Sequence, residues 1–325
     1  MALDVGYTNG VIATREKYLL KEKISRLCEL SAEEAFRALL ESGFGGGAET
    51  ATDVYDYEKL VAAEEAKLDE FIREYAPSEI EKAYLLAPRD FHNAKALIKA
   101  AYLQTDATRM LSPAGLVLVE TLSACVASGD FAPIKEQNAA LGAACEEATE
   151  YLKENENGAK VGEIFEGALY KYLWTLSKKR KDLKKLLQAK ADMTNILIAF
   201  RATSAEEAEE KYLPVGSVSK KSLALLFDEN TEKAENAFAK TPYKAFVEKC
   251  YAAKEKGLPP TEAEKIRDGY ETAFFAERKY ELEKSEPFLY YVYRRRAESA
   301  NVRIVFVCLL AGLSEHDVKN RLRAW

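Results

Sequence analysis

The chain offers few side chains that are typical of catalysis or metal binding. It has only two histidines, His92 and His316, and neither has a second potential ligand at helical spacing. A metal site or a general acid–base pair needs such a neighbour. We therefore interpret both histidines as residues without a metal-binding or catalytic role.

The cysteines are also unlike a reactive or metal-binding set. They are scattered, odd in number and never spaced as Cys-x-x-Cys, which is typical of a reducing cytosol and excludes a zinc ribbon. We interpret each one as a small core residue. The five are Cys28, Cys125, Cys145, Cys250 and Cys308.

A glycine-rich stretch, Gly43-Phe-Gly-Gly-Gly47, invites comparison with a phosphate-binding loop. Such a loop needs a following Lys-Ser/Thr and a preceding strand, and this stretch has neither. We interpret it as the C-terminal cap of a helix followed by a flexible loop.

Carboxylates are abundant, but the acidic stretch around Glu146 and Glu163 lies among other charges on predicted solvated helices. A catalytic carboxylate needs surroundings that shift its pKa towards the working pH. No nucleophile elbow or His-Glu-x-x-His motif is present. We expect no catalytic residue, no cofactor and no metal ion.

The elements that hold these side chains are predicted to be helices. The 325 residues include only 16 Gly and 9 Pro, 48% are hydrophobic, and strand-like alternation is nearly absent. Several helix starts are marked by a Ser or Thr with an acid three residues later. These caps are Ser31, Ser78, Ser204, Thr261 and Ser314. The prediction is an all-α protein of antiparallel helices.

One pattern occurs three times along the chain. An acid is followed three residues later by an asparagine, and the positions one, three, four and five residues after that asparagine are apolar. The pairs are Asp90 with Asn93, Asp192 with Asn195, and Glu298 with Asn301. In the first two copies, Leu-Ser-Pro-Ala-Gly or Leu-Pro-Val-Gly begins 18 residues after the asparagine. The period of about a hundred residues indicates a repeated multi-helix module.

The repeat predicts both a division of the chain and a role for the asparagines. We expect three similar helical modules, 1–105, 106–207 and 208–325, arranged with pseudo-threefold symmetry. A buried amide must satisfy its donors and acceptors, most cheaply on a neighbouring backbone. We therefore interpret the six repeat-defining residues as structural residues that fix how helices dock.

The charge distribution favours a protein partner. The 53 acids outnumber the 47 bases, which argues against general affinity for nucleic acid or an anionic bilayer. Basic residues gather at 178–185 and at Arg294, Arg295 and Arg296, while 146–166 is acidic. Such segregation favours oriented docking, so we consider the three arginines a possible interface.

No secretory signal or membrane span is expected. The N-terminus lacks a basic region followed by an apolar stretch. The longest apolar run, 304–313, has ten residues, against the roughly 20 needed to cross a bilayer. We expect the protein to stay in the cytoplasm and to reach a membrane only through a partner.

Several segments together resemble a known family, the C subunit of V-type (archaeal-type) rotary ATPases, whose eukaryotic relative is subunit d. They are Tyr7-Thr-Asn-Gly-Val-Ile-Ala-Thr-Arg15, Asp90-Phe-His-Asn93, Leu213-Pro-Val-Gly216, and the helix 298–313 before Ser314-Glu-His-Asp317. The resemblance covers nearly the whole chain, including its length and triplication.

The resemblance implies a funnel-shaped, all-α body of three modules on the cytoplasmic face of the membrane rotor ring. It implies that the partners are the central axle subunits and that ring. In this family the subunit is a non-catalytic coupler that turns with the axle and transmits torque.

Two other interpretations stay open on the residues alone. A helical adaptor unrelated to rotary ATPases would explain the repeats equally well. An all-α enzyme with an unfamiliar site is the second alternative, and a deep pocket lined by carboxylates with shifted pKa values would favour it.

Overall fold

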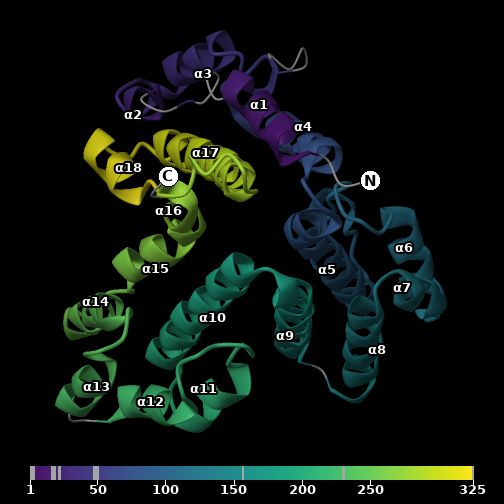
Figure 1. The fold of residues 1–325 in the computed structure, drawn as a ribbon, viewed down its shortest axis with the longest axis vertical. Helices are drawn as coiled ribbons and strands as arrows, with labels where there is room; N and C mark the ends of the chain where they lie inside the picture. Colours follow the sequence, from purple (N-terminus) through teal and green to yellow (C-terminus); the bar gives the residue numbers. More distant parts are fainter. Residues whose placement is uncertain are drawn as a thin grey trace. The chain divides into compact units, whose positions relative to one another are not determined.

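The fold consists of helices joined by short turns (Figure 1). The structure, a computed structural model, describes residues 4–15, 20, 23–46, 51–155, 157–228 and 231–323. Within these ranges every regular element is a helix, which confirms the all-α prediction. None of the helices in the same ranges is both long enough and apolar enough to span a bilayer.

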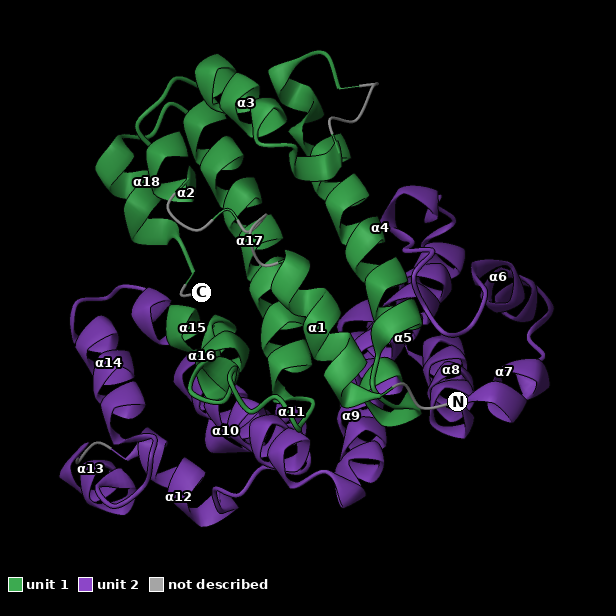
Figure 2. Cartoon of the chain, turned by 45° about the horizontal axis from the view of Figure 1, so that its top comes forward, with its two compact units in different colours: residues 1–82, 264–325 green, residues 83–263 purple. Residues whose placement is uncertain are grey.

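The chain divides into two compact units (Figure 2). One unit joins the two ends of the chain, residues 1–82 and 264–325, and the other is the continuous segment 83–263. This division describes contact density, which is a different property from internal similarity. The three-module division and its boundaries therefore stay a prediction.

The first unit packs N-terminal helices against C-terminal ones. Its elements are α1 (Val5–Arg15), α2 (Lys23–Leu27), α3 (Ala32–Glu41), η2 (Phe44–Gly46), η3 (Val54–Asp56), α4 (Tyr57–Tyr75), α16 (Tyr270–Ala276), α17 (Glu286–Leu310) and α18 (Glu315–Arg321). The buried ring of Phe306 on α17 stacks on Tyr57 with 5.1 Å between centroids, and it meets Phe36 edge-on at 6.3 Å. These aromatic contacts join segments that lie far apart in the sequence.

The second unit contains a continuous run of helices. They are α6 (Val119–Ser128), α7 (Ala132–Gln137), α8 (Ala139–Glu154), α9 (Gly158–Leu176), η5 (Ser177–Lys179), α10 (Lys181–Arg201), α11 (Ala205–Lys211), α12 (Lys220–Ala224), η6 (Leu225–Phe227), α13 (Thr231–Phe238) and α14 (Lys244–Glu255). It also holds most of α5 (Glu79–Leu103) and the turn η4 (Thr108–Met110), and α15 (Thr261–Asp268) crosses its C-terminal boundary. The apolar side chains of Phe91, Leu122, Leu141 and Phe165 meet in one core cluster.

The capping pattern locates helix starts well. Ser31, Ser204 and Ser314 each accept a hydrogen bond from the backbone N–H three residues later, at the starts of α3, α11 and α18. At Ser31 the capping box is complete, because Glu34 also accepts from the Ser31 N–H. The interaction with Ser31 lowers the pKa of Glu34.

The glycine-rich stretch ends helix α3, as predicted. Gly43 has φ of +76° and donates its N–H to the Leu40 carbonyl, which is a helix C-terminal conformation that favours glycine. The chain then turns inward, so Phe44 and Gly45 are buried, with Gly45 against α4, while Gly43 and Gly46 are exposed. Gly47 lies outside the described residues.

The close approach at Gly45 generates a stability prediction. A Cβ atom there would lie 2.7 Å from the Leu60 carbonyl oxygen, and φ is +69°. Gly43→Ala is the matched control, because a Cβ at Gly43 meets nothing within 4 Å. We expect Gly43→Ala to lower the free energy of unfolding by about 1–2 kcal/mol for its positive φ alone. Gly45→Ala should cost at least about 1 kcal/mol more, because backbone must move. Equal losses in urea titrations would contradict the close approach.

Candidate functional site

The three acid–asparagine pairs lie on three long helices. These are α5 with 25 residues, α10 with 21 and α17 with 25. All six side chains are buried: Asp90, Asn93, Asp192, Asn195, Glu298 and Asn301. A spacing of three residues puts both members of each pair on one face of the helix. Each helix therefore brings a carboxyl group and an amide into its unit's interior.

The first two asparagines bind the backbone of a single downstream residue at both of its polar groups. The Asn93 amide donates to the Ser112 carbonyl oxygen at 2.7 Å and accepts from the Ser112 N–H at 2.9 Å. Asn195 makes the same pair of bonds with Leu213, at 3.0 and 2.7 Å. We call this two-bond arrangement an amide clasp. It gives partners to the backbone donor and acceptor of that residue, which are buried at Leu213 and partly buried at Ser112.

The third asparagine forms the same clasp near the C-terminus. Asn301 donates to the Arg323 carbonyl oxygen at 3.1 Å and accepts from the Arg323 N–H at 2.8 Å. The repeated Leu-containing turn does not reveal this partner, because the third copy lacks that turn. In the first copy the partner is Ser112, one residue beyond Leu111, where the shared turn begins. The three asparagines thus make equivalent bonds.

The first two acids accept hydrogen bonds from the turn that follows each clasp. Asp90 accepts from the N–H groups of Leu116 and Val117 at 3.1 and 3.0 Å. A Cβ atom on Gly115 would lie 2.0 Å from an oxygen of this carboxylate. The absence of a side chain there lets the backbone reach the acid.

The second acid has an even larger set of donors. Asp192 accepts from the N–H groups of Ser217 and Val218 at 2.7 and 2.9 Å, and from the Ser217 hydroxyl at 2.6 Å. The Tyr243 hydroxyl donates to the same carboxylate at 2.8 Å. A Cβ atom on Gly216 would lie 2.6 Å from this carboxylate. As at Gly115, only a residue without a side chain lets the backbone of the turn approach the acid. Four donors converge on this buried carboxylate.

The third acid accepts a hydrogen bond from the N-terminal part of the chain instead. Glu298 accepts from the Leu20 N–H at 2.8 Å and from Arg295 Nη1 at 2.8 Å. In this copy the backbone donor belongs to the N-terminal segment, since Leu20 lies 278 positions before Glu298. Burial raises the pKa of Glu298, although Arg295 and the Leu20 N–H oppose that shift. Burial also lowers the pKa of Arg295.

The three consecutive arginines have different surroundings. The Arg295 side chain is 10% exposed and pairs with Glu64 as well as with Glu298. Arg294 and Arg296 are half-buried, and Arg294 donates to the Tyr290 hydroxyl at 3.2 Å. The charge of Arg295 is therefore paired with two carboxylates inside the fold. An interface role for this cluster is best tested at Arg294 and Arg296 alone.

The histidines and cysteines have ordinary local surroundings. His92 lies 3.0 Å from the Met110 carbonyl oxygen, and His316 lies 2.8 Å from the Asn320 amide. All five cysteines are buried, as predicted for core residues, and none of them forms a disulfide; burial raises the pKa of Cys145 to about 12. The part of the chain that the structure describes holds no group of acids, histidines and cysteines suited to a metal ion.

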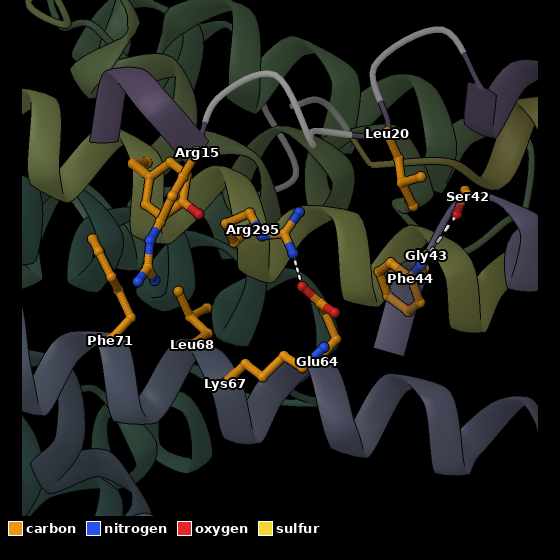
Figure 3. Close-up of a pocket in the computed structure, with 11 residues that line it drawn as sticks. Arg15, Leu20, Ser42, Gly43, Phe44, Glu64, Lys67, Leu68, Phe71 and Arg295 are labelled. Carbon is orange, nitrogen blue, oxygen red and sulfur yellow. Dashed lines mark hydrogen bonds and ion pairs between the residues drawn. The ribbon is translucent and has the colours of Figure 1, made fainter. Parts of the chain in front are cut away.

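A pocket of about 400 Å³ lies in the first unit, and nothing in the sequence predicted it (Figure 3). It is bounded by α4 and α17, the end of α1, Leu20 and the turn after α3. Figure 3 shows the side chains of Glu64 and Arg295, which both line the pocket, pointing at each other and joined by an ion pair. Glu64 also accepts from the Gly45 N–H at 2.8 Å. The lining residues are Arg15, Leu20, Ser42, Gly43, Phe44, Glu64, Lys67, Leu68, Phe71, Tyr291 and Arg295.

Comparison with known families decides the chain's relationship. A model of the ATP synthase (C/AC39) subunit family matches residues 8–321. The chain belongs to this family. No curated protein matched the chain. The family assignment confirms the resemblance to the V-type ATPase C subunit and makes this chain a rotary ATPase subunit.

The amide clasps of this C/AC39 family member generate the second prediction. Asn195→Leu leaves the N–H and carbonyl of Leu213 without the amide, so we expect the free energy of unfolding to fall by about 3 kcal/mol or more. The control is Asn320→Leu, which also follows an acid by three residues but is exposed. It should change stability by less than about 0.5 kcal/mol. Similar losses in chemical denaturation would show that the clasp has no special value.

Proposed function

We propose that this subunit is a non-catalytic coupler in the central stalk of a V-type rotary ATPase. It links the central axle subunits to the membrane rotor ring, on the cytoplasmic face, and transmits torque for ATP-driven ion transport or ATP synthesis. The observation that carries the proposal is the family match over residues 8–321. The same match decides against an adaptor unrelated to rotary ATPases.

The use of the buried polar groups supports a mechanical role. In each of the three asparagines, the amide N–H donates to a backbone carbonyl and the amide oxygen accepts from a backbone N–H. Asp90 and Asp192 also accept from backbone N–H groups. Hydrogen-bonded, closely packed interiors deform little, because neither voids nor unpaired groups offer an alternative arrangement. A coupler benefits from such stiffness, because a subunit that deformed elastically would transmit the rotation of the axle to the ring with a delay.

An internal comparison supports a protein-binding surface on the second unit. Val117 and Val218 occupy equivalent positions, since the N–H of each bonds to the repeat's acid. The next residue occupies the N-cap position of the following helix in both copies. Ser219 accepts from the Ser222 N–H at 3.1 Å, whereas Leu118 gives α6 no side-chain cap. Leu118 is nevertheless 69% exposed.

The same contrast occurs two residues earlier. Leu116, which is 37% exposed, occupies the position of Ser217 in the second copy. Exposed leucines at these two positions cost solubility, and at Leu118 they also cost a helix cap. Contact with a partner subunit would offset both costs. We therefore assign Leu116 and Leu118 to a surface that another subunit of the complex covers.

The proposed coupling role predicts the phenotype of the missing subunit. Membranes and heads prepared without it should retain ATP hydrolysis by the soluble head, while ATP-driven ion transport is lost because torque has no path to the ring. Adding the purified subunit back should restore transport, measured as ion uptake into vesicles. Uptake that persists without the subunit and is stopped by blocking the ring would contradict the proposal.

The Leu118 surface predicts opposite effects on stability and assembly. Leu118→Ser supplies the missing cap, so we expect the isolated subunit to gain about 1 kcal/mol in unfolding free energy while its retention on solubilised rotor complexes falls. Leu118→Ala should weaken retention without the gain. The exposed Leu258 gives the control, because Leu258→Ala should change neither measurement. Normal retention of both Leu118 variants would remove this residue from the interface.

A further inference from the structure

The pocket between α1, α4 and α17 has the size and lining of a small-ligand site. Its volume of about 400 Å³ falls within the range of roughly 300–1,000 Å³ that is common for such sites. Part of its wall is apolar, and part carries charge. The apolar residues are Leu20, Phe44, Leu68, Phe71 and Tyr291.

Among the described residues that line the pocket, the one acid already has hydrogen-bond and ion-pair partners within the protein. Glu64 accepts from the Gly45 N–H and pairs with Arg295, and it is the only carboxylate among the described lining residues. Arg295 in turn pairs with Glu298, which lies behind the wall. Because Arg295 pairs with two carboxylates, it is not available to an external anion.

Two other cations of the wall have no such partner. Neither Arg15 nor Lys67 forms an ion pair with any residue in the described ranges. The Arg15 guanidinium lies over the rings of Phe71 and Tyr75, with its carbon 4.8 and 5.2 Å from their centroids. Lys67 lies one helical turn before Phe71 on α4, but its Nζ is directed towards Gly46 and Glu64 and away from Arg15 (Figure 3).

The stacking of Arg15 matters for binding. A guanidinium that lies on an aromatic face keeps its N–H donors directed outward in its own plane, where they can bind carboxylate or phosphate oxygens in pairs. Because the rings restrict the side chain in advance, a ligand loses less conformational entropy when it binds. Arg15 is therefore a partly preorganised anion receptor beside an apolar wall.

We propose that this pocket binds a small organic anion. Its carboxylate or phosphate oxygens pair with Arg15, and its apolar body lies against Leu68 and Phe71. The apolar walls select against a bare inorganic ion, which would lose hydration there without apolar contacts in return. This site goes beyond the coupling function and does not depend on it.

The test uses calorimetry and thermal unfolding of the full-length subunit with three probes: benzoate, phenyl phosphate and inorganic phosphate. We expect saturable binding of benzoate or phenyl phosphate in the millimolar range or tighter, and which of the two binds better identifies the anionic group. Inorganic phosphate should bind at least about tenfold more weakly. Sodium chloride at matched ionic strength separates binding from general salt effects.

Variants connect the binding to the two cations. Arg15→Gln should weaken the better probe by about tenfold, since it removes a charge-assisted bond, whereas Lys67→Gln should weaken it less because the Nζ of Lys67 is directed away from Arg15. Arg37→Gln is the control, because Arg37 is an exposed cation of the same unit that does not line the pocket. No saturable binding of either organic probe would overturn the proposal. Equal binding by wild type and Arg15→Gln would also overturn it, and so would a preference for inorganic phosphate.

Discussion

A buried polar group must find a partner inside the protein, and this requirement shapes the long helices of the chain. Each of α5, α10 and α17 carries a carboxyl group and an amide into an apolar interior. Water is excluded there, so the amides and carboxylates bind backbone that would itself be left unsatisfied. In the first two copies this forces the following segment to return along its helix. The glycines Gly115 and Gly216 then lie where a Cβ atom would collide with the acid.

The sequence revealed the clasps to the extent that they are local. The three-residue spacing and the apolar positions after it identify Asn93, Asn195 and Asn301 as buried, and the shared turn lies within one residue of the first two partners. The third partner, Arg323, gave no signal because its segment has neither the proline nor the glycine of the other turns. The two hydrogen bonds of Arg323 match those of the other copies, but the sequence around it does not. The helical class and the helix caps were predictable for the same reason, since both depend on neighbours within a few residues.

The contacts that sequence reasoning missed are those between distant segments. Leu20 and Glu298 are 278 positions apart, and no local pattern indicates that one binds the other. The pocket arises in the same way, from α1, α4 and α17 packing together. One signal for Arg295 was available: it precedes Glu298 by three residues, so both must share a helix face. That spacing distinguishes Arg295 from Arg294 and Arg296, and it indicates that the Arg295 side chain points into the fold.

The bond between Leu20 and Glu298 has a consequence for the order of events during synthesis. Residues 83–263 form one continuous unit and can bury their core while the ribosome is still adding the rest. The first 82 residues cannot, because their core is completed by side chains of α17 such as Val302 and Phe306. Apolar surface on the nascent N-terminal helices therefore stays uncovered until almost the whole chain has emerged. The core of the first 82 residues is therefore complete only after α17 has been synthesised.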